Sequence, residues 1–446
     1  MRNAVKDLTK QRVHVITMGC AKNVVDSEKL MAQLKLSNIE LSATIEDADI
    51  AVINTCGFIA AAKQESIDVI IENVKRKSRG KLKKVYAMGC LTERYREDLI
   101  KEIPEVDAFF GSNQMKDVVQ ELGGDYKYEL LGERTLTTPS HFAYLKISEG
   151  CDNPCSFCAI PIMRGLHVSK TVEDLVSEAQ LLASRGVKEL VVIGQDTTYY
   201  GLDIYQQRRL PELLERLADI NGIEWVRLMY AYPAKFPKEI LKVIARHPNI
   251  CKYMDMPIQH VADEVLKSMR RGISKRGLKE LLAEIREQVP DITLRTTIIV
   301  GYPAEGEREF DELLEFVTEE KFDRLGVFTY SQEDGTTAFP LADPIPEVEK
   351  EHRKAAIMEA QREISEEKNA GLIGSVQRVL VERKEGDQYV GRTAADAPEI
   401  DNEVYISGST ELQTGSFHEV EVVNASEYDL YGRLQHERSE PTTIAV

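Results

Sequence analysis

Six short apolar stretches alternate with helical segments through the middle of the chain, and this alternation limits the fold more than any other feature. In order, the stretches are FAYLKIS, ELVVIGQ, WVRLMYA, KYMDMPI, TLRTTIIVG and RLGVFTYS, with segments such as VEDLVSEAQLLASRG and LPELLERLADI between them. Strands joined by helical crossovers run parallel, and the helices cover the sheet. The pattern predicts an α/β fold with a partial, TIM-like (βα)6 barrel over residues 137–370. A charged helix from about Pro346 to Asn369 would carry the chain out of this barrel.

Polar or conformationally special residues stand directly after most of these stretches. The carboxyl ends of barrel strands are where active sites form, so these positions are candidates for a site. Any one of them alone is equally well explained as a solvated loop residue. The residues are Gln195, Asp196, Tyr232, Pro233, Gln259, His260, Gly301, Tyr302, Gln332 and Glu333.

A cysteine-rich loop, EGCDNPCSFCAIP, follows the first barrel stretch and holds Cys151, Cys155 and Cys158. Three thiolates at this spacing can bind three irons of a 4Fe-4S cluster and leave the fourth iron open. Electron carriers close every iron with cysteine, whereas a catalytic metal centre keeps one position free. The alternatives are a structural zinc site or three unrelated core cysteines. Zinc needs a fourth ligand, and the nearest downstream histidine, His167, lies nine residues past Cys158, outside the usual ligand spacing.

An apolar stretch that ends at a cysteine occurs three times before the barrel. VHVITMGC ends at Cys20, ADIAVINTC at Cys56 and KKVYAMGC at Cys90, at intervals of 36 and 34 residues. These intervals match a strand, a crossover helix and a return, so residues 11–130 are predicted to form an open parallel α/β domain. Ligand sites form beyond the carboxyl ends of such strands, where the three thiols would converge as a second open cluster site. Alternatively, each cysteine is a small buried residue near a strand end.

The segment that follows the charged helix alternates polar and apolar residues in short runs with glycine turns. This pattern predicts a small antiparallel β-barrel over residues 373–441. Residues 371–446 contain six basic and 14 acidic side chains, a net charge of −8. Small barrels that bind nucleic acid show a basic face, so direct RNA binding by this barrel is not expected.

Charge and hydropathy of the whole chain limit its partners and its location. The 446 residues include 57 basic and 74 acidic side chains, a formal charge of −17, which opposes binding to phosphate backbones or anionic membranes and favours a basic partner. No apolar run is long enough for a signal peptide or a membrane span, which predicts a cytoplasmic protein without membrane contact. Seven cysteines in that reducing compartment indicate ligands rather than disulfides. The seventh, Cys251, has no partner at ligand spacing and is predicted to be structural.

The CxxxCxxC loop after a first barrel strand resembles the signature of radical S-adenosylmethionine enzymes. Together with the amino-terminal cysteine domain and a TRAM-like terminal barrel, it resembles the methylthiotransferases of that superfamily over essentially the whole chain. The resemblance implies two 4Fe-4S clusters and S-adenosylmethionine as cofactors. One cluster would bind the methionine half of the cofactor at its open iron, and the auxiliary cluster would handle the inserted sulfur. The implied ligands are Cys151, Cys155 and Cys158 for the first cluster, and Cys20, Cys56 and Cys90 for the auxiliary one.

The same resemblance implies further cofactor contacts, and it implies no catalytic residue beyond the cluster ligands. Phe157 would lie close to the adenine, Gln195 would contact the methionine amino group, and Gly301 would belong to a glycine motif beside the cofactor. Arg271, or its neighbour Arg270, could pair with a carboxylate of cofactor or substrate. Alternatively, Gln195 is a loop amide, Gly301 forms a tight turn, and the two arginines lie at a solvated helix end.

Three motifs, GCAKNVVDSE, NTCGFIAAAKQESI and EGCDNPCSFCAIPIMRG, resemble the RimO-type branch. That branch adds a methylthio group to the β-carbon of an aspartate in the small-subunit ribosomal protein S-twelve; Ala21 departs from its frequent proline. The implied partners are a basic ribosomal protein held by the acidic TRAM barrel, an electron donor and a sulfur source. A basic substrate suits the negative charge. The alternatives are methylthiolation of adenosine in transfer RNA and a noncatalytic iron-sulfur scaffold or electron carrier.

Overall fold

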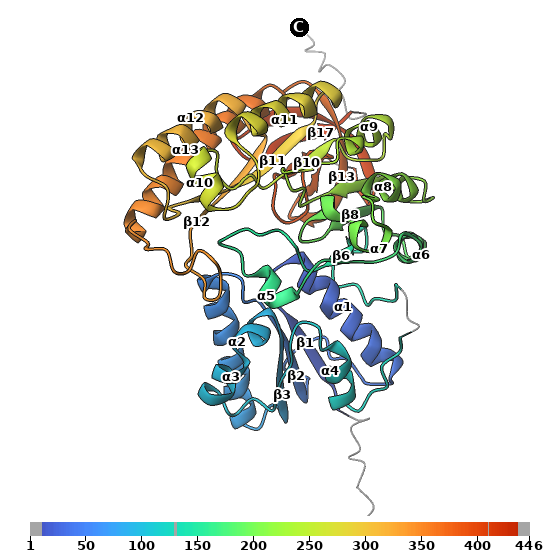
Figure 1. Cartoon of the computed structure of the whole chain (residues 1–446). Coiled ribbons are helices and arrows are strands. Elements are labelled where there is room, and N and C mark those ends of the chain that lie inside the picture. The colour runs from blue at the N-terminus through green and yellow to red at the C-terminus, as the bar shows by residue number, and fades with distance from the viewer. Residues whose placement is uncertain (1–10, 129–131, 409, 436–446) are drawn as a thin grey trace, which may run out of the picture.

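The structure is a computed structural model that describes residues 11–128, 132–408 and 410–435. An amino-terminal α/β unit lies below a larger unit of parallel strands and helices, and the carboxyl-terminal strands pack against the upper unit (Figure 1). No helix within these ranges is both long enough and apolar enough to cross a membrane.

The amino-terminal unit is a four-stranded parallel sheet in the order β1-β2-β3-β4. Alternate residues of β2 point to opposite faces, so Val52 packs with Leu30 and Leu34 of α1, and Ile53 packs with Ile70 of α2. Each strand end therefore meets the start of a helix at the same edge, which confirms the predicted open α/β fold. The elements are β1 (Val13–Thr17), α1 (Ala21–Leu36), β2 (Ile50–Thr55), α2 (Ala60–Ser78), β3 (Lys84–Gly89), α3 (Cys90–Glu102), β4 (Ala108–Phe109) and α4 (Met115–Glu121).

The central unit contains the six predicted strands in two parallel sheets, β5-β8-β9 and β10-β11-β12. An isolated bridge between Val226 and Ile250 and a hydrogen bond from the Ala231 N–H to the Asp255 carbonyl connect the two sheets. The outer strands β5 and β12 belong to different sheets, so the barrel is partial, as expected. The strands are β5 (Phe142–Lys146), β8 (Glu189–Ile193), β9 (Trp225–Leu228), β10 (Tyr253–Asp255), β11 (Thr293–Val300) and β12 (Arg324–Thr329), and a hairpin of β6 (Ser148–Glu149) and β7 (Val168–Ser169) extends from β5.

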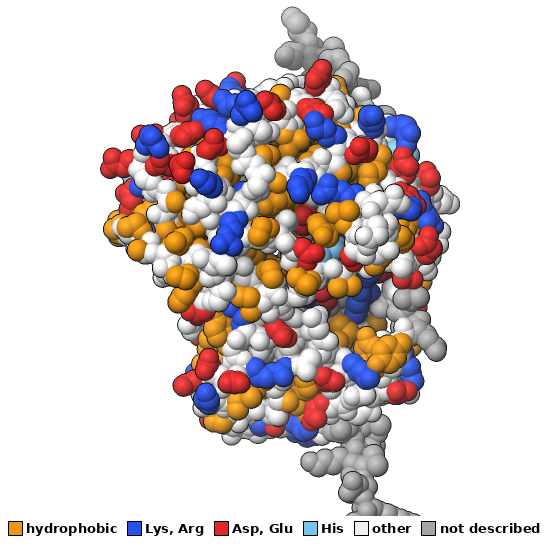
Figure 2. Space-filling view, viewed as in Figure 1, with side chains coloured by type: hydrophobic (Ala, Val, Ile, Leu, Met, Phe, Trp, Pro, Cys, Tyr) orange, Lys and Arg blue, Asp and Glu red, His pale blue; other side chains and the backbone are white. Residues whose placement is uncertain are grey.

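Helices cover the outside of these strands because each has an apolar stripe that packs on them. The helices are α5 (Ile160–Arg164), α6 (Val172–Ser184), α7 (Leu202–Tyr205), α8 (Leu210–Ala218), α9 (Glu239–Arg246), α10 (Asp263–Ser268), α11 (Lys275–Gln288), α12 (Glu307–Glu320) and α13 (Glu347–Ala370), with a 3-10 turn at Thr197–Tyr199. Acidic side chains gather at the upper left in Figure 2, where α12 and α13 lie in Figure 1.

The terminal unit is a closed barrel of five strands in the order β13-β14-β15-β17-β16. The strands are β13 (Val376–Glu385), β14 (Gln388–Arg392), β15 (Val404–Ser407), β16 (Phe417–Ala425) and β17 (Leu430–Leu434). Four of the five pairs are antiparallel, but β15 and β17 run parallel where the barrel closes. The predicted small antiparallel barrel is confirmed. It has one parallel pair where it closes, because β16 reverses the chain direction between β15 and β17 and pairs with β13 and β17.

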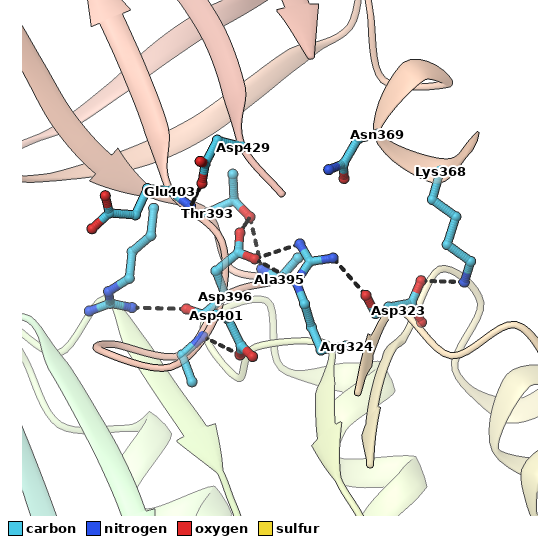
Figure 3. Close-up of polar contacts among 12 residues, drawn as sticks. Asp323, Arg324, Lys368, Asn369, Thr393, Ala395, Asp396, Asp401, Glu403 and Asp429 are labelled. Carbon is cyan, nitrogen blue, oxygen red and sulfur yellow. Dashed lines mark hydrogen bonds and ion pairs between the residues drawn. The ribbon is translucent and has the colours of Figure 1, made fainter. Parts of the chain in front are cut away.

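The loop between β14 and β15 inserts into the amino-terminal end of the central barrel. Arg324 donates to Asp396 at 2.9 Å, and Asp401 accepts from Tyr253 at 2.7 Å and from Arg295 at 3.3 Å. Figure 3 shows Asp396 between Arg324 and Thr393. Asp396 and Asp401 are therefore buried against barrel arginines, and these two carboxylates of the acidic terminal barrel do not face a partner.

The interior of the central barrel is closed from both ends by side chains. Val25, with its neighbours Ala21 and Val24 in the first turns of α1, enters from the carboxyl-terminal side of the strands, and Ala397 of the inserted loop enters from the other. Between them lies an apolar cluster that includes Cys251, in keeping with the prediction of a structural cysteine. The two cysteine-bearing units thus meet at the carboxyl ends of their strands. The cluster also contains Phe142, Tyr144, Val191, Ile193, Trp225, Met229 and Tyr253.

Candidate active site

The three amino-terminal cysteines lie at one edge of the sheet, each just past a strand. Cys20 stands in the loop between β1 and α1, Cys56 follows β2, and Cys90 begins α3. Cys56 and Cys90 are buried, and Cys20 is exposed. Gly19 has a φ of +85°, and a Cβ added there would come within 2.7 Å of the Cβ of Cys56. Only glycine allows the Cys20 loop to approach Cys56 this closely.

The three thiols influence one another electrostatically. Burial raises the pKa of Cys90 to about 11, and the neighbouring Arg164 lowers it while Cys20 and Cys56 raise it. Burial and the proximity of Cys20 also raise the pKa of Cys56. Metal ligation requires thiolates, so these cysteines need a nearby positive centre to ionise at neutral pH. Three close thiols of this kind fit an iron-sulfur cluster.

The second cysteine triplet lies in the loop between β6 and α5. Ser156 anchors this loop to the later barrel strands, since its N–H donates to the Met269 carbonyl at 3.0 Å and its hydroxyl lies 2.9 Å from that of Tyr302. The amide of Asn153 donates to Asp196 after β8 at 2.8 Å. Contacts to strand ends far apart in the chain therefore hold the loop over the barrel mouth.

Burial also raises the pKa of two thiols in this second triplet. Burial, with a contribution from the adjacent Cys155, raises the pKa of Cys158 to about 12 and that of Cys151 to about 11. Within the described ranges no group of three or more Cys, His, Asp or Glu residues is placed to hold a single metal ion. Thiolates that bind separate irons of one cluster do not need to converge on a point, so both triplets fit clusters as donor sets.

Arg164 joins the two cysteine triplets. It ends α5, six residues after Cys158, and its Nε donates to Sγ of Cys90 at 3.2 Å. Its Nη1 pairs with Asp26 at 2.6 Å, and its Nη2 donates to Asn23. The residue is only 3% exposed. One side chain from the CxxxCxxC helix therefore contacts a predicted ligand of the auxiliary cluster directly.

A buried charge network surrounds Arg164. Lys146 of β5 pairs with Asp26 and with Glu149, and Glu149 also pairs with Arg164 at 3.2 Å. Burial of Asp26 favours its neutral form, but Lys146 and Arg164 more than offset this and lower its pKa to about 2. Asp26 is therefore ionised at neutral pH and holds both cations in place.

A second contact joins the two units on the far side of the site. Glu333, after β12, accepts from Lys63 of α2 and from Arg94 of α3, each at 2.8 Å. Arg94 also donates to the Gly57 carbonyl at 3.0 Å and lies one helical turn after Cys90. Glu333 therefore fixes the segments that carry Cys56 and Cys90 relative to the central barrel.

Arg271, which the sequence predicted as a cofactor contact, is buried rather than a solvated helix end. Its Nη1 donates to Sγ of Cys155 at 3.3 Å and its Nη2 to the Pro257 carbonyl at 2.5 Å, and its guanidinium stacks 4.4 Å from the Tyr232 ring centroid. Its Nε is buried without a partner among the described residues. Arg270 instead lies at the surface with a φ of +57°.

The other predicted cofactor contacts lie around the same mouth. Phe157 packs against Met269 and Tyr302 beside the cysteine loop. Gln195 follows β8 and is partly exposed. Gly301 directly follows β11 with a φ of +76°, and its N–H donates to Glu305 at 2.9 Å. All three lie at carboxyl ends of barrel strands or in the adjoining loop, and their roles as cofactor contacts stay predictions.

Sequence reasoning did not single out Arg164, Asp26 or Lys22, and it named Glu333 only as a residue after a strand. Each charge is buried only because residues distant in the chain close over it. A charged residue in a single sequence looks the same whether it is solvated or buried, so the sequence carries no signal for these contacts.

Comparison with known proteins agrees with this three-part arrangement. The family model described as "Uncharacterized protein family UPF0004" matches residues 12–111. The model "Radical SAM superfamily" matches residues 145–317, and the model "TRAM domain" matches residues 373–434. Among solved structures, the radical S-adenosylmethionine methyltransferase TsrM from Kitasatospora setae shares the fold, with a TM-score of 0.55 at 13% identity, covering 84% of this chain and 79% of that one.

Much more similar relatives cover nearly the whole chain. The ribosomal protein uS12 methylthiotransferase RimO of Flavobacterium johnsoniae is 53% identical over 431 residues, which are 96% of this chain and 99% of the relative. The protein of the same name from Cytophaga hutchinsonii is 51% identical over 428 residues, 95% of this chain and 98% of the relative. With two cysteine triplets that meet at one interface and this degree of identity, the chain belongs to the RimO family of radical S-adenosylmethionine methylthiotransferases.

Proposed function

We propose that this enzyme adds a methylthio group to the β-carbon of an aspartate in ribosomal protein uS12. The observation that carries the proposal is the bond from Arg164 to Cys90, since it brings the two cysteine triplets into one site. A sulfur-inserting enzyme needs both a radical source and a sulfur donor within reach of one carbon atom. Positioning them in one cavity replaces an improbable encounter with an oriented one.

We assign Cys151, Cys155 and Cys158 to the cluster that binds S-adenosylmethionine and the amino-terminal triplet to the auxiliary cluster. When bound, these groups supply the radical that removes hydrogen and the methylated sulfur that replaces it. The protein side chains orient them. Arg164 and Arg271 donate to ligand sulfurs, and such charge-assisted bonds stabilise thiolates. The amino-terminal ligands are Cys20, Cys56 and Cys90.

The negative charge supports a basic protein substrate. Helix α12 has seven acidic residues and one basic residue, so acidic surface extends beyond the terminal barrel. A positive partner is steered toward such a surface, and transfer RNA is repelled by it. The terminal barrel would contact the substrate through its exposed carboxylates, because Asp396 and Asp401 are already paired inside. The reaction also needs an electron donor and a sulfur source, and a ribosomal substrate places the enzyme in the cytoplasm.

Anaerobic reconstitution with iron and sulfide, followed by reaction with reductant and S-adenosylmethionine, tests the proposal. Purified uS12 and transfer RNA are offered separately, and peptides and nucleosides are analysed by mass spectrometry. A methylthio group on an aspartate of uS12 alone is expected. A product found only on nucleosides would overturn the substrate assignment. Cys158→Ala should abolish cofactor cleavage, whereas Cys20→Ala should retain cleavage and lose sulfur insertion.

A further inference from the structure

Lys22 is a buried cation without a counter-ion beside the candidate site. It lies in the first turn of α1, two residues after Cys20, and is 4% exposed. Its Nζ sits 3.1 Å from the ring centroid of Tyr230. No carboxylate pairs with it among residues 11–128, 132–408 and 410–435.

The neighbouring buried cations differ from Lys22 in this respect. Lys146 and Arg164 both pair with Asp26, and Arg94 pairs with Glu333. A buried ammonium normally needs a paired anion, and contact with an aromatic face offsets only part of the cost of removing it from water. Arg271 also has no carboxylate partner, but it donates to Sγ of Cys155 and to the Pro257 carbonyl. The ammonium of Lys22 has only the face of Tyr230, and no carboxylate of the described residues neutralises it.

The position of Tyr230 places this charge between the two cysteine triplets. Tyr230 follows β9 at the carboxyl-terminal end of the barrel, and two residues later the hydroxyl of Tyr232 lies 3.7 Å from Sγ of Cys155. Lys22 itself stands in the first turn of α1, and Cys20 directly precedes that helix. Lys22 therefore lies where segments that carry ligands of both proposed clusters meet.

Tyr230, whose ring contacts Lys22, has a strained backbone. Its φ is +59°, a left-handed conformation that is rare for a bulky residue. Two contacts hold it there: its N–H donates to Asp255 at 3.0 Å, and its carbonyl accepts from the N–H of Thr197 at 3.1 Å. Strain that the surroundings enforce in this way is concentrated at binding and catalytic sites.

We propose that Lys22 binds the side-chain carboxylate of the target aspartate and so selects aspartate and positions its β-carbon. This inference rests on the proposed function. The β-carbon is bonded directly to the carboxylate carbon, so an ion pair at the carboxylate holds the reacting atom one bond away. An asparagine side chain has the same shape but no charge, and it would leave the buried ammonium unneutralised.

Two synthetic peptides that span the target site of uS12 and differ only in aspartate or asparagine at the target test this inference. Binding to the full-length reconstituted enzyme is measured by fluorescence anisotropy without reductant, and kcat/KM is measured separately. The wild-type enzyme should prefer the aspartate peptide by about 10- to 100-fold in both measurements. Lys22→Met should bring this preference to within about 3-fold, and Lys22→Arg, which keeps the charge, should restore part of it.

The matched control is Lys35→Met, at the exposed end of the same helix, which should keep the wild-type preference. Iron content and circular dichroism show whether each variant is folded. If Lys22→Met does not fold, Lys22→Gln takes its place in the test. A Lys22→Met or Lys22→Gln enzyme that still prefers aspartate as the wild type does would overturn the inference, as would a wild type that binds both peptides equally. Failure of the proposed function looks different: the aspartate peptide binds preferentially but gains no methylthio group.

Discussion

The guanidinium of Arg164 bridges Sγ of Cys90 and the carboxylate of Asp26, at 3.2 and 2.6 Å. Arg164 comes from the unit that carries the CxxxCxxC loop, whereas Cys90 and Asp26 come from the amino-terminal unit. Arg164 is only 3% exposed, so little solvent is available to replace these bonds, and this side chain is one of the contacts that align the two cysteine triplets.

Arg164→Met should weaken the interface between the two units. The substitution leaves Asp26 with Lys146 alone in a buried site, and breaking such a pair costs about 3–5 kcal/mol. Urea denaturation should report this loss, and the electron paramagnetic resonance spectrum of the reduced auxiliary cluster should shift because Cys90 loses a donor. Arg276→Met, at an exposed arginine of α11, is the control. An unchanged spectrum and midpoint would contradict the role given to Arg164.

Glu333→Gln should loosen the other contact between the units. Lys63 and Arg94 both depend on this carboxylate, and the Arg94 and Glu333 side chains are each 3% exposed. We expect a loss of about 3 kcal/mol in unfolding free energy. Hydrogen exchange should rise in residues 57–63 and 90–96, which carry the network. Glu307→Gln, at an exposed position of α12, should alter neither measurement.

The buried Glu178 of α6 should make stability depend on acid pH. Its burial disfavours ionisation, but Lys170, Lys29 and Arg134 outweigh this and lower its pKa from 4.5 to about 2. A lowered carboxyl pKa stabilises the fold by about 3 kcal/mol above pH 4.5, and this contribution falls as the pH drops from there toward 2.

The test compares urea midpoints of the wild type and Glu178→Gln between pH 7 and pH 3. The gap between the two proteins should be largest at pH 7 and should narrow below pH 4.5. Glu307→Gln, at an exposed position of α12, should leave the midpoint unchanged. A gap that stays constant with pH would show that Glu178 does not titrate as stated.

Asp401→Ala should release the inserted loop of the terminal barrel. Arg295 and Tyr253 lose their shared partner, and we expect a destabilisation of about 3 kcal/mol. Hydrogen exchange over residues 393–401 should rise most, because these residues lie between the two barrels. Asp387→Ala, in the exposed turn between β13 and β14, should leave exchange in this loop unaltered.

Local patterns predicted most of the architecture. The three apolar stretches that end at Cys20, Cys56 and Cys90 became parallel neighbours, because a strand, helix and strand of that length closes only in this way. The six barrel strands appeared where the apolar stretches predicted them. The parallel seam between β15 and β17 was missed, since strand direction in a closed barrel depends on which strands meet at closure rather than on any residue in them.

The cysteine spacing and the strand order were thus determined by the sequence alone, because they depend on contacts among near neighbours and on the periods of strand and helix. Only the tertiary structure decided three other features. Arg164 connects the two triplets, Glu333 pairs with cations of the amino-terminal unit, and Lys22 is buried against Tyr230 without a carboxylate partner among the described residues. Burial is what turns an ordinary arginine, glutamate or lysine into a positioning group. Burial depends on segments more than a hundred residues apart packing over the same side chain, as Asp26 and Arg164 do.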